Sequence, residues 1–417
     1  MSELTKGTHS PVRILFIEHF GHGGLIHYAH CLCQALAEHG VQVSLLTAKD
    51  YELAGRPRSF RLLNHLPMWN PYAGSENRRK GISRRLEQAG KGLRYVITLC
   101  FVLFTIWKER PDIVHMSELK FLPDLFIFLL RGRPKITYTC HNVQRFSDHT
   151  SGNLVRANWL WHYAQTWMYR LCSGVIFHAE ENVRDFYKIF GFLPAKHIVI
   201  PHGEYGFFAP DQSVSTSGAK QALGLDETKK IILFFGAIRR YKGLDVLLEA
   251  VASLRKSVPD IQLVVAGAPG RDVNIETLYN QANQLGLDES VVWHIKYILH
   301  EEVHLYFYAS DVVVLPHRKA YDSGVLKISQ ALGRPVIVTN IGGLAAAVEG
   351  GKAGLIVPPE DPQAMTQALK ELLTDTSQAQ MLAKRGQTLA HTAFSWTQIA
   401  KQTEKFYREL QGLPCAY

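Results

Sequence analysis

Cysteine is scarce in this sequence, with six residues among 417, and no two of them form a CxxC pair. Several lie inside apolar runs, where a small buried thiol is the ordinary role. The composition therefore predicts a reducing compartment, with no cysteine-held metal cluster. The six residues are Cys31, Cys33, Cys100, Cys140, Cys172 and Cys415.

Long hydrophobic runs are also missing. The first apolar run, Val12–Ile17, is too short for a signal peptide. The longest, Tyr95–Trp107, falls short of the roughly 20 residues that a helix needs to span a bilayer. We therefore expect a buried or interfacial helix there. Hydrophobic residues nevertheless make up 47% of the 417 residues, which is enough for two packed domains and excludes a disordered or fibrous chain.

Acidic residues are outnumbered by lysine and arginine, so the formal net charge is +9. The excess is concentrated in one segment, where Glu87 is the single acid, and such a segment attracts anions. Nucleic acid, anionic lipid and phosphorylated substrates are all compatible with this charge alone. The basic residues of the segment are Arg78, Arg79, Lys80, Arg84, Arg85, Lys91 and Arg94.

Short β-branched runs alternate with longer helical patterns along the chain, which is typical of βαβ units and parallel sheets. The first half contains six strand candidates: Val12–Glu18, Val41–Thr47, Ile113–His115, Lys135–Cys140, Gly174–His178 and His197–Pro201. The second half contains another six: Lys230–Phe235, Gln262–Ala266, Val291–His294, Asp311–Leu315, Pro335–Thr339 and Gly354–Val357.

Between the two series, Gly206–Ala219 is rich in polar and turn residues and is interpreted as a linker. The sequence thus predicts an α/β protein of two tandem, doubly wound, Rossmann-like domains, residues 1–205 and 206–395. Ligands of such domains bind at the carboxyl ends of the strands, so the expected site is the cleft between them. A final helical pattern, residues 396–417, is expected to pack back on the first domain.

Two loops have the composition of phosphate sites. Phe20–Leu25 joins a strand to a helix and contains Gly23 and Gly24, which permit close approach to a ligand, although a tight turn explains them equally well. Phe234–Asp245 follows a strand and contains Gly236, Arg239, Arg240 and Lys242. Its cations can neutralise a diphosphate, and the alternative is a solvated basic loop.

Two further strand ends carry candidate residues. After the strand at Asp311–Leu315, a helix opens at Ser323–Leu326. Ser323 is a plausible N-cap, and Gly324 and Val325 offer backbone amides to an anion. His141 ends the apolar strand Lys135–Cys140; a structural role competes there with a functional one. His202 is similar but lies nearer the linker.

Taken in order, these blocks resemble the retaining GT-B glycosyltransferases of family 4, also called "glycosyl transferases group 1". The resemblance extends over most of the chain, and the RYKGL and YDSGVL segments are similar to a bacterial subset that builds cell-surface glycans. It implies that Arg239 or Arg240 and Lys242 hold the donor diphosphate together with the amides of Ser323–Leu326. It also implies that Gly23 and Gly24 approach the donor and that His141 lies near the transferred sugar.

The sequence departs from the family pattern at two positions. Most members carry two glutamates eight positions apart, at places that align here with Ala320 and Ile328. Asp322 is the nearest carboxylate to the first. Contacts to the sugar and ribose must therefore be made differently, although the subset with the SGVL segment often lacks these glutamates.

The expected reaction is sugar transfer from a nucleotide-diphosphate donor, without a metal or other cofactor, since no Asp-x-Asp motif stands near a strand end. Three alternatives stay open: an epimerase or phosphorylase of the same fold, an inactive nucleotide-sugar-binding subunit, and a nucleic-acid binder, which no recognised motif supports. The segment Arg78–Trp107, basic and then apolar, suits the surface of an anionic membrane. This favours a cytoplasmic protein held on the inner face of the plasma membrane, with a glycan or lipid-linked sugar as acceptor.

Overall fold

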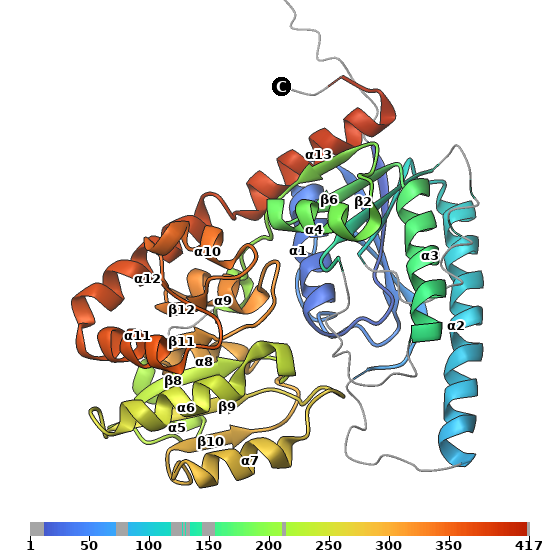
Figure 1. The fold of residues 1–417 in the computed structure, drawn as a ribbon. Helices are drawn as coiled ribbons and strands as arrows, with labels where there is room; N and C mark the ends of the chain where they lie inside the picture. The colour runs from blue at the N-terminus through green and yellow to red at the C-terminus, as the bar shows by residue number, and fades with distance from the viewer. Residues whose placement is uncertain are drawn as a thin grey trace, which may run out of the picture.

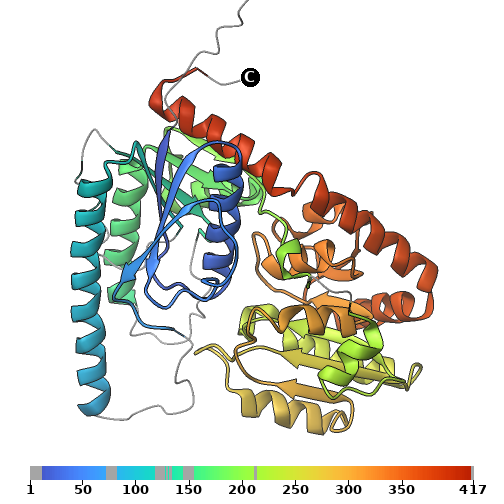
Figure 2. The ribbon, with the colours of Figure 1, turned by 180° about the vertical axis from the view of Figure 1, so that it is seen from behind.

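The computed structural model describes residues 12–71, 82–117, 127, 130, 134–143, 155–210 and 214–414, without the side chains of 82–89 and 155–161. Arg78, Arg79, Lys80 and Cys415 lie outside the described residues, as do the side chains of Arg84, Arg85 and Glu87. Two α/β domains face each other, each a parallel sheet flanked by helices (Figures 1 and 2).

Seven described strands form the first sheet, in the order β3-β2-β1-β4-β5-β6-β7 and all parallel. The strands are β1 (Arg13–Ile17), β2 (Gln42–Ala48), β3 (Arg61–Leu66), β4 (Ile113–Met116), β5 (Lys135–Cys140), β6 (Gly174–Phe177) and β7 (His197–Val199). The helices are α1 (Gly24–Glu38), α2 (Ile82–Glu109), α3 (Val155–Leu171) and α4 (Glu180–Phe190).

Six described strands form the second sheet, in the order β10-β9-β8-β11-β12-β13 and again parallel. They are β8 (Lys230–Phe235), β9 (Ile261–Ala266), β10 (Val291–His294), β11 (Val312–Leu315), β12 (Val336–Thr339) and β13 (Leu355–Val357). The helices are α5 (Thr216–Ala222), α6 (Leu244–Arg255), α7 (Ile275–Gln284), α8 (Val303–Ala309), α9 (Gly324–Ala331), α10 (Leu344–Ala347), α11 (Pro362–Thr374) and α12 (Thr376–His391). Three short 3₁₀ turns are also described: η2 (Gly206–Phe208), η3 (Arg240–Lys242) and η4 (Glu349–Gly351).

Burial on both faces explains why the strands are almost continuously apolar. Along β1, Ile14 and Phe16 enter one core cluster while Leu15 and Ile17 enter the other, because successive side chains point to opposite faces. The second sheet is covered in the same way by two clusters. Both sheets have the doubly wound Rossmann order, so the α/β prediction is confirmed.

The predicted linker, Gly206–Ala219, extends too far, because its last residues form the start of a helix. Helix α5 begins at Thr216, where the hydroxyl of Ser215 accepts the Gly218 N–H at 3.0 Å. A run of Ser, Thr and Gly is typical of a loop, but its serine caps a helix whose Ala219 is fully buried.

The last helix, α13 (Trp396–Gln411), returns to the first domain and packs against α1 (Figure 1). Its Ile399, Phe406 and Tyr407 belong to the same core cluster as β1 and α1. The chain therefore crosses between the domains twice. The crossings are tied together, since the Glu204 N–H donates to Phe394 O at 2.9 Å and the Trp396 indole N–H donates to Glu204 O at 2.6 Å.

Candidate active site between two Rossmann-like domains

The strand order of each sheet reverses beside its first strand, between β1 and β4 and between β8 and β11. Ligands of doubly wound domains bind outside the carboxyl ends of the strands at such reversals. The loop Phe20–Leu25, here called the glycine loop, follows β1, and the basic loop follows β8. Asp322 and Ser323 follow β11. The predicted site residues therefore lie at the positions where this fold places ligands.

The basic loop, residues 236–243, is held by two glycines with positive φ, Gly236 at 93° and Gly243 at 69°. A Cβ on Gly243 would clash with the carbonyl oxygen of Pro316, so only glycine lets this loop pack against the segment after β11. A Cβ on Gly236 would lie 3.1 Å from Lys242 Nζ and 3.4 Å from Val325 Cγ2. The fold thus brings Gly236, Lys242 and Val325 together.

Lys242 is the cation that this arrangement leaves for a ligand. Burial, with the nearby Arg239 charge, lowers the pKa of its ammonium to about 8. Within the described part of the chain, no carboxylate forms an ion pair with Lys242. A desolvated cation without a counter-ion favours the binding of an anion.

Arg239 differs from Lys242. Its Nη1 lies 2.9 Å from Asp272 Oδ1, and the other oxygen of Asp272 accepts the Arg240 N–H at 3.0 Å. The guanidinium therefore already has a carboxylate partner. Arg239 therefore faces Asp272, whereas Lys242 lies beside Gly236 near Val325.

Arg318, to which the sequence analysis gave no role, holds this loop in place. Its guanidinium binds both oxygens of Asp245, each at 2.8 Å, and also donates to Glu360 at 2.9 Å and to Arg240 O at 2.9 Å. Its backbone N–H donates to Tyr241 O at 2.6 Å. These carboxylates raise the pKa of Arg318 further above its usual value. A cation directly after a strand end was the only sequence signal for this role.

Helix α9 presents its amino end to the same region. Ser323 occupies the N-cap position as predicted, but its side chain does not cap the helix; instead the carboxylate of Asp322 accepts the Ser323 N–H at 2.6 Å. Gly324 faces the ring of Tyr205, whose hydroxyl donates to Gly24 O at 3.3 Å. The starts of α9 and α1, one from each domain, therefore meet around Tyr205. Leu326 is fully buried in the core, so only its backbone is available to a ligand.

The two positions where the family carries glutamates are apolar and buried here. Ala320 is 8% exposed and Ile328 6%, and both belong to the core of the second domain. Near them lies a buried lysine that the sequence analysis missed, and it interacts electrostatically with Asp322. Lys327, 1% exposed, has Nζ 3.1 Å from the ring centroid of Phe394, and burial lowers its pKa to about 8. Burial alone would raise the pKa of Asp322, but Lys327 and two histidines lower it.

His141 belongs to a histidine cluster beside α1. The carbonyl of Ile200 can only accept, so His178 Nδ1 donates to it at 3.0 Å. His178 Nε2 must then accept when this ring is neutral, and His141 Nδ1 donates to it at 3.0 Å. Burial lowers the pKa of His178, and that of His202 to about 4, which keeps both rings neutral near pH 7. The cluster therefore fixes the tautomer and the ring orientation of His141.

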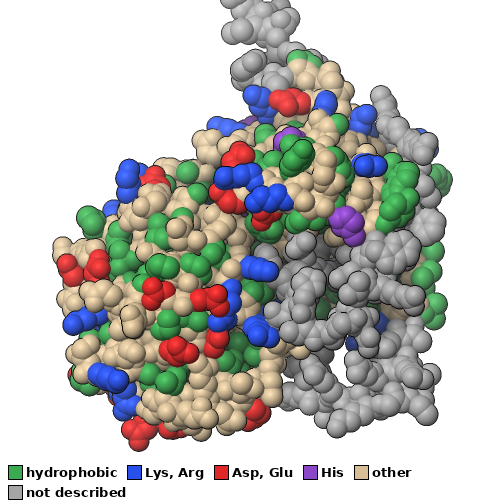
Figure 3. All heavy atoms as spheres, viewed as in Figure 1, with side chains coloured by type: hydrophobic (Ala, Val, Ile, Leu, Met, Phe, Trp, Pro, Cys, Tyr) green, Lys and Arg blue, Asp and Glu red, His purple; other side chains and the backbone are tan. Residues whose placement is uncertain are grey.

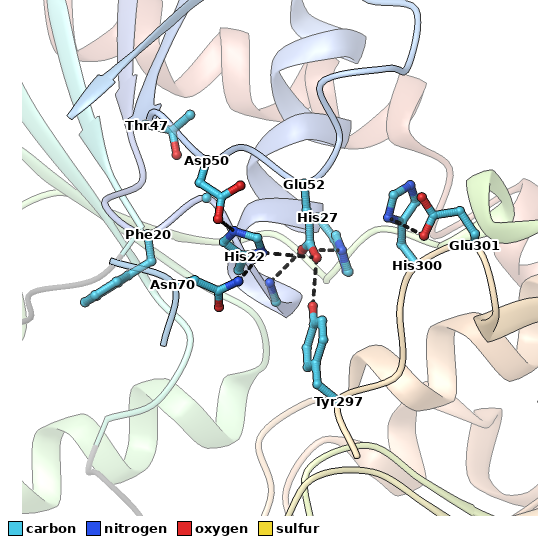
Figure 4. Close-up of polar contacts among 12 residues, drawn as sticks. Phe20, His22, His27, Thr47, Asp50, Glu52, Asn70, Tyr297, His300 and Glu301 are labelled. Carbon is cyan, nitrogen blue, oxygen red and sulfur yellow. Dashed lines mark hydrogen bonds and ion pairs between the residues drawn. The ribbon is translucent and has the colours of Figure 1, made fainter. Parts of the chain in front are cut away.

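The glycine loop is surrounded by acids and histidines from both domains (Figure 4). Gly23 has φ 85°, and its N–H donates to Glu52 at 2.7 Å. Among the described residues, no atom beyond the chain neighbours of Gly24 and the backbone of its own helix lies within 4 Å of the place of a Cβ, which leaves room for a ligand at the first turn of α1. Burial would lower the pKa of His22, but Glu52 and Asp50 raise it. Glu52 in turn accepts the hydroxyl of Tyr297, from the second domain, at 2.9 Å.

With this geometry in view, the comparisons with known proteins are informative. Residues 22–203 match the family model "Glycosyltransferase Family 4", and residues 216–389 match "Glycosyl transferases group 1". Together the two models cover most of the chain. The protein belongs to this glycosyltransferase family. The family predicted from the sequence motifs is thus confirmed.

Among similar sequences, a D-inositol 3-phosphate glycosyltransferase from Corynebacterium urealyticum is 36% identical over 221 residues, which are 52% of this glycosyltransferase and 52% of the relative. A protein of the same name from a Nocardioides species is 33% identical over 226 residues, 52% of this chain and 48% of the relative. The chain therefore spans about half the length of the curated relatives it matches.

Among solved structures, a sucrose-phosphate synthase from Thermosynechococcus elongatus superposes with a TM-score of 0.72 at 20% identity, over 96% of this chain and 99% of that one. Anabaena HepE in complex with UDP and glucose gives 0.70 at 18% identity, over 96% of this chain and 100% of that one. At these identities the likeness establishes the GT-B fold.

Proposed function

We propose that this protein transfers a glycosyl group from a nucleotide-diphosphate sugar to an acceptor hydroxyl, with retention of configuration. The observation that carries the proposal is Lys242, a desolvated cation without a described carboxylate partner, placed beside the start of α9 where the two domains meet. Family membership supports the same reaction class.

In the proposed reaction, the bond between the anomeric carbon and the donor phosphate breaks while the acceptor oxygen bonds to that carbon from the same face. Negative charge grows on the leaving diphosphate, which takes the acceptor proton. Lys242 and the amides of Ser323–Leu326 stabilise this charge more strongly than that of the bound donor, because they are fixed before the reaction begins. In this proposal His141, whose ring is held by His178, contacts the sugar.

The first test is a screen for thermal stabilisation and donor turnover across UDP-, GDP-, ADP- and dTDP-sugars. A donor at 100 times its dissociation constant should stabilise the fold by about 2.7 kcal/mol. UDP is the first nucleotide to try, because Anabaena HepE was solved with it. Epimerised donor without acceptor, or a requirement for free phosphate, would replace the proposal by an epimerase or a phosphorylase. Binding without any turnover would indicate a binding subunit.

We further propose that the acceptor is lipid-linked or a surface-glycan precursor and that the protein lies on the inner face of the plasma membrane. Helix α2 supports this. One face of it, including Tyr95, Leu99 and Val102, packs into the first domain. The opposite face is apolar yet open to solvent, with Leu93 63%, Phe104 55% and Trp107 68% exposed.

The neighbouring helix α3 adds Tyr163 and Trp167, 57% and 46% exposed, and hydrophobic side chains gather at this edge of the molecule (Figures 1 and 3). Residues Gly90–Glu109 of α2 have the length and composition of a membrane-spanning helix, with 33% of the window buried. Because one face is packed against the domain, we propose that α2 lies in the interface rather than across the bilayer. Exposed cations near the apolar face, such as Arg94 and Lys108, match an anionic surface.

Co-sedimentation with vesicles that contain anionic lipid, at low and high salt, tests this surface. Binding should weaken with salt and fall when Arg78, Arg79, Arg84 and Arg85 become glutamine. It should also fall for Phe104→Ser with Trp107→Ser. Met381→Ser is the matched control, because Met381 is an equally exposed apolar residue, at 61%, in the second domain. If the wild-type protein does not bind anionic vesicles at low salt, the membrane proposal fails and a soluble acceptor is favoured.

A further inference from the structure

Glu52, in the loop after β2, contacts both domains through its carboxylate. Oε1 accepts the Gly23 N–H at 2.7 Å and lies 2.9 Å from His27 Nε2, both in the first domain. Oε2 accepts the hydroxyl of Tyr297, from the second domain, at 2.9 Å and lies 3.6 Å from His22 Nδ1. The side chain of Glu52 is 7% exposed, so these bonds are shielded from water (Figure 4).

On the first-domain side, the bond to Gly23 fixes the start of α1. Gly23 is the N-cap residue of this helix, and because glycine has no side chain it cannot cap the first turn itself. The first amides of a helix have no partner within it, so their direction depends on the residue that holds the cap. Glu52 therefore orients the turn at which Gly24 leaves room for a ligand.

On the second-domain side, Tyr297 is carried by a firmly anchored segment. It follows β10, the edge strand of the second sheet, and its neighbour Ile298 is 7% exposed within the core of that domain. A displacement of the second domain would therefore carry Tyr297 with it. The carboxylate of Glu52 would then lose its hydrogen bond to Tyr297 and keep the longer contact of Oε2 with His22. One restraint on the orientation of Oε1 would be lost with that bond.

We propose that Glu52 is a positioning residue that couples the contact between the domains to the order of the glycine loop. With Tyr297 in contact, the loop is held in the geometry that admits a ligand at Gly24. Without that contact, the Gly23 amide is released and the first turn of α1 loses its fixed direction. The ligand involved is the donor only if the proposed transfer reaction is correct, whereas the coupling itself needs no substrate.

Hydrogen exchange of the full-length protein tests the coupling directly. Tyr297→Phe removes one hydroxyl from the second domain, and we expect amides of residues 20–27 in the first domain to exchange about three- to tenfold faster. Reciprocally, Glu52→Gln should speed exchange in residues 295–302. Tyr279→Phe is the control, because Tyr279 lies on α7 of the same domain and packs on Trp293, away from Glu52. Unchanged exchange of residues 20–27 in Tyr297→Phe overturns the proposal.

A kinetic readout separates this role from simple stabilisation. Tyr297→Phe should raise the donor KM about three- to tenfold and leave kcat within about twofold, since Lys242 and α9 are untouched. An equal loss in kcat would contradict a positioning role. If no donor is turned over at all, the proposed function fails, and the exchange experiment still decides the coupling.

Discussion

Arg318 binds Asp245 through two parallel hydrogen bonds, Nη1 to Oδ1 and Nη2 to Oδ2, each 2.8 Å long. The pair joins the segment after β11 to the first turn of α6. The loop that carries Lys242 lies between these two elements. The position of the loop that carries the ammonium therefore depends on the guanidinium of Arg318, which bonds to Asp245, Glu360 and the carbonyl of Arg240.

Replacing this guanidinium should weaken donor binding while the fold survives. Lys cannot form the paired bonds, so Arg318→Lys should raise the dissociation constant for the donor about tenfold. Calorimetric titration with UDP measures this. Arg385→Lys breaks a similar two-bond pair with Glu349 elsewhere in the domain and should leave the affinity unchanged. Equal effects of both substitutions would mean that Arg318 acts only through general stability.

Removing the ammonium itself should be far more damaging to catalysis. Lys242→Ala should lower kcat/KM about 100- to 1,000-fold, because the charge is needed most in the transition state. Circular dichroism should show an intact fold. The control is Lys370→Ala, which removes an exposed lysine from α11. Near-normal turnover in a folded Lys242→Ala protein would rule out the assignment.

Donor affinity should depend on pH through the same residue. The pKa of Lys242 is lowered to about 8, so its charge is present below that pH and lost above it. The dissociation constant should be flat from about pH 7 to 8 and then rise about tenfold for each pH unit. Lys242→Arg should abolish this rise in the dissociation constant above pH 8, since a guanidinium stays charged. A wild-type curve that stays flat to about pH 9.5 would contradict the lowered pKa.

Stability should show a second pH dependence, centred on Glu52. Despite burial, its histidine and amide partners hold the pKa of Glu52 below the usual 4.5, so its contribution is present above pH 4.5 and fades as pH falls below it. The pKa of His22 is raised above 6.5, so its contribution is complete below pH 6.5 and fades as pH rises. Urea unfolding should therefore show the greatest loss for Glu52→Gln, about 1 to 3 kcal/mol, between these two values. A loss that is constant across the pH range would exclude the ionic contribution.

Chelation should leave the reaction intact. In the proposed mechanism, Lys242 and the amides of α9 supply the positive field that a divalent ion would supply. Turnover should therefore survive an excess of EDTA. Complete loss, restored by magnesium or manganese, would require a different mechanism.

Features set by the ends of strands could be predicted from the sequence, whereas contacts between distant loops could not. Regular apolar strands such as β8 were located from their composition. The edge strand β3 was missed because half of its six residues are exposed, only the last is buried, and it shows no alternation. Glu52 and Tyr297, which are 245 positions apart, carry no periodic signal, and only the packing of two domains brings them together.

The return of α13 has a consequence for the order of assembly during synthesis. The first domain needs the last helix, because Tyr407 covers its sheet and bonds to the buried His115 at 2.5 Å. The second domain, in contrast, is built from one continuous stretch of chain that ends before α13. Although the ribosome makes the first domain first, that domain cannot close its core until translation of α13 is complete. A nascent chain that stops before Trp396 would expose the first domain to proteases while the second is already folded.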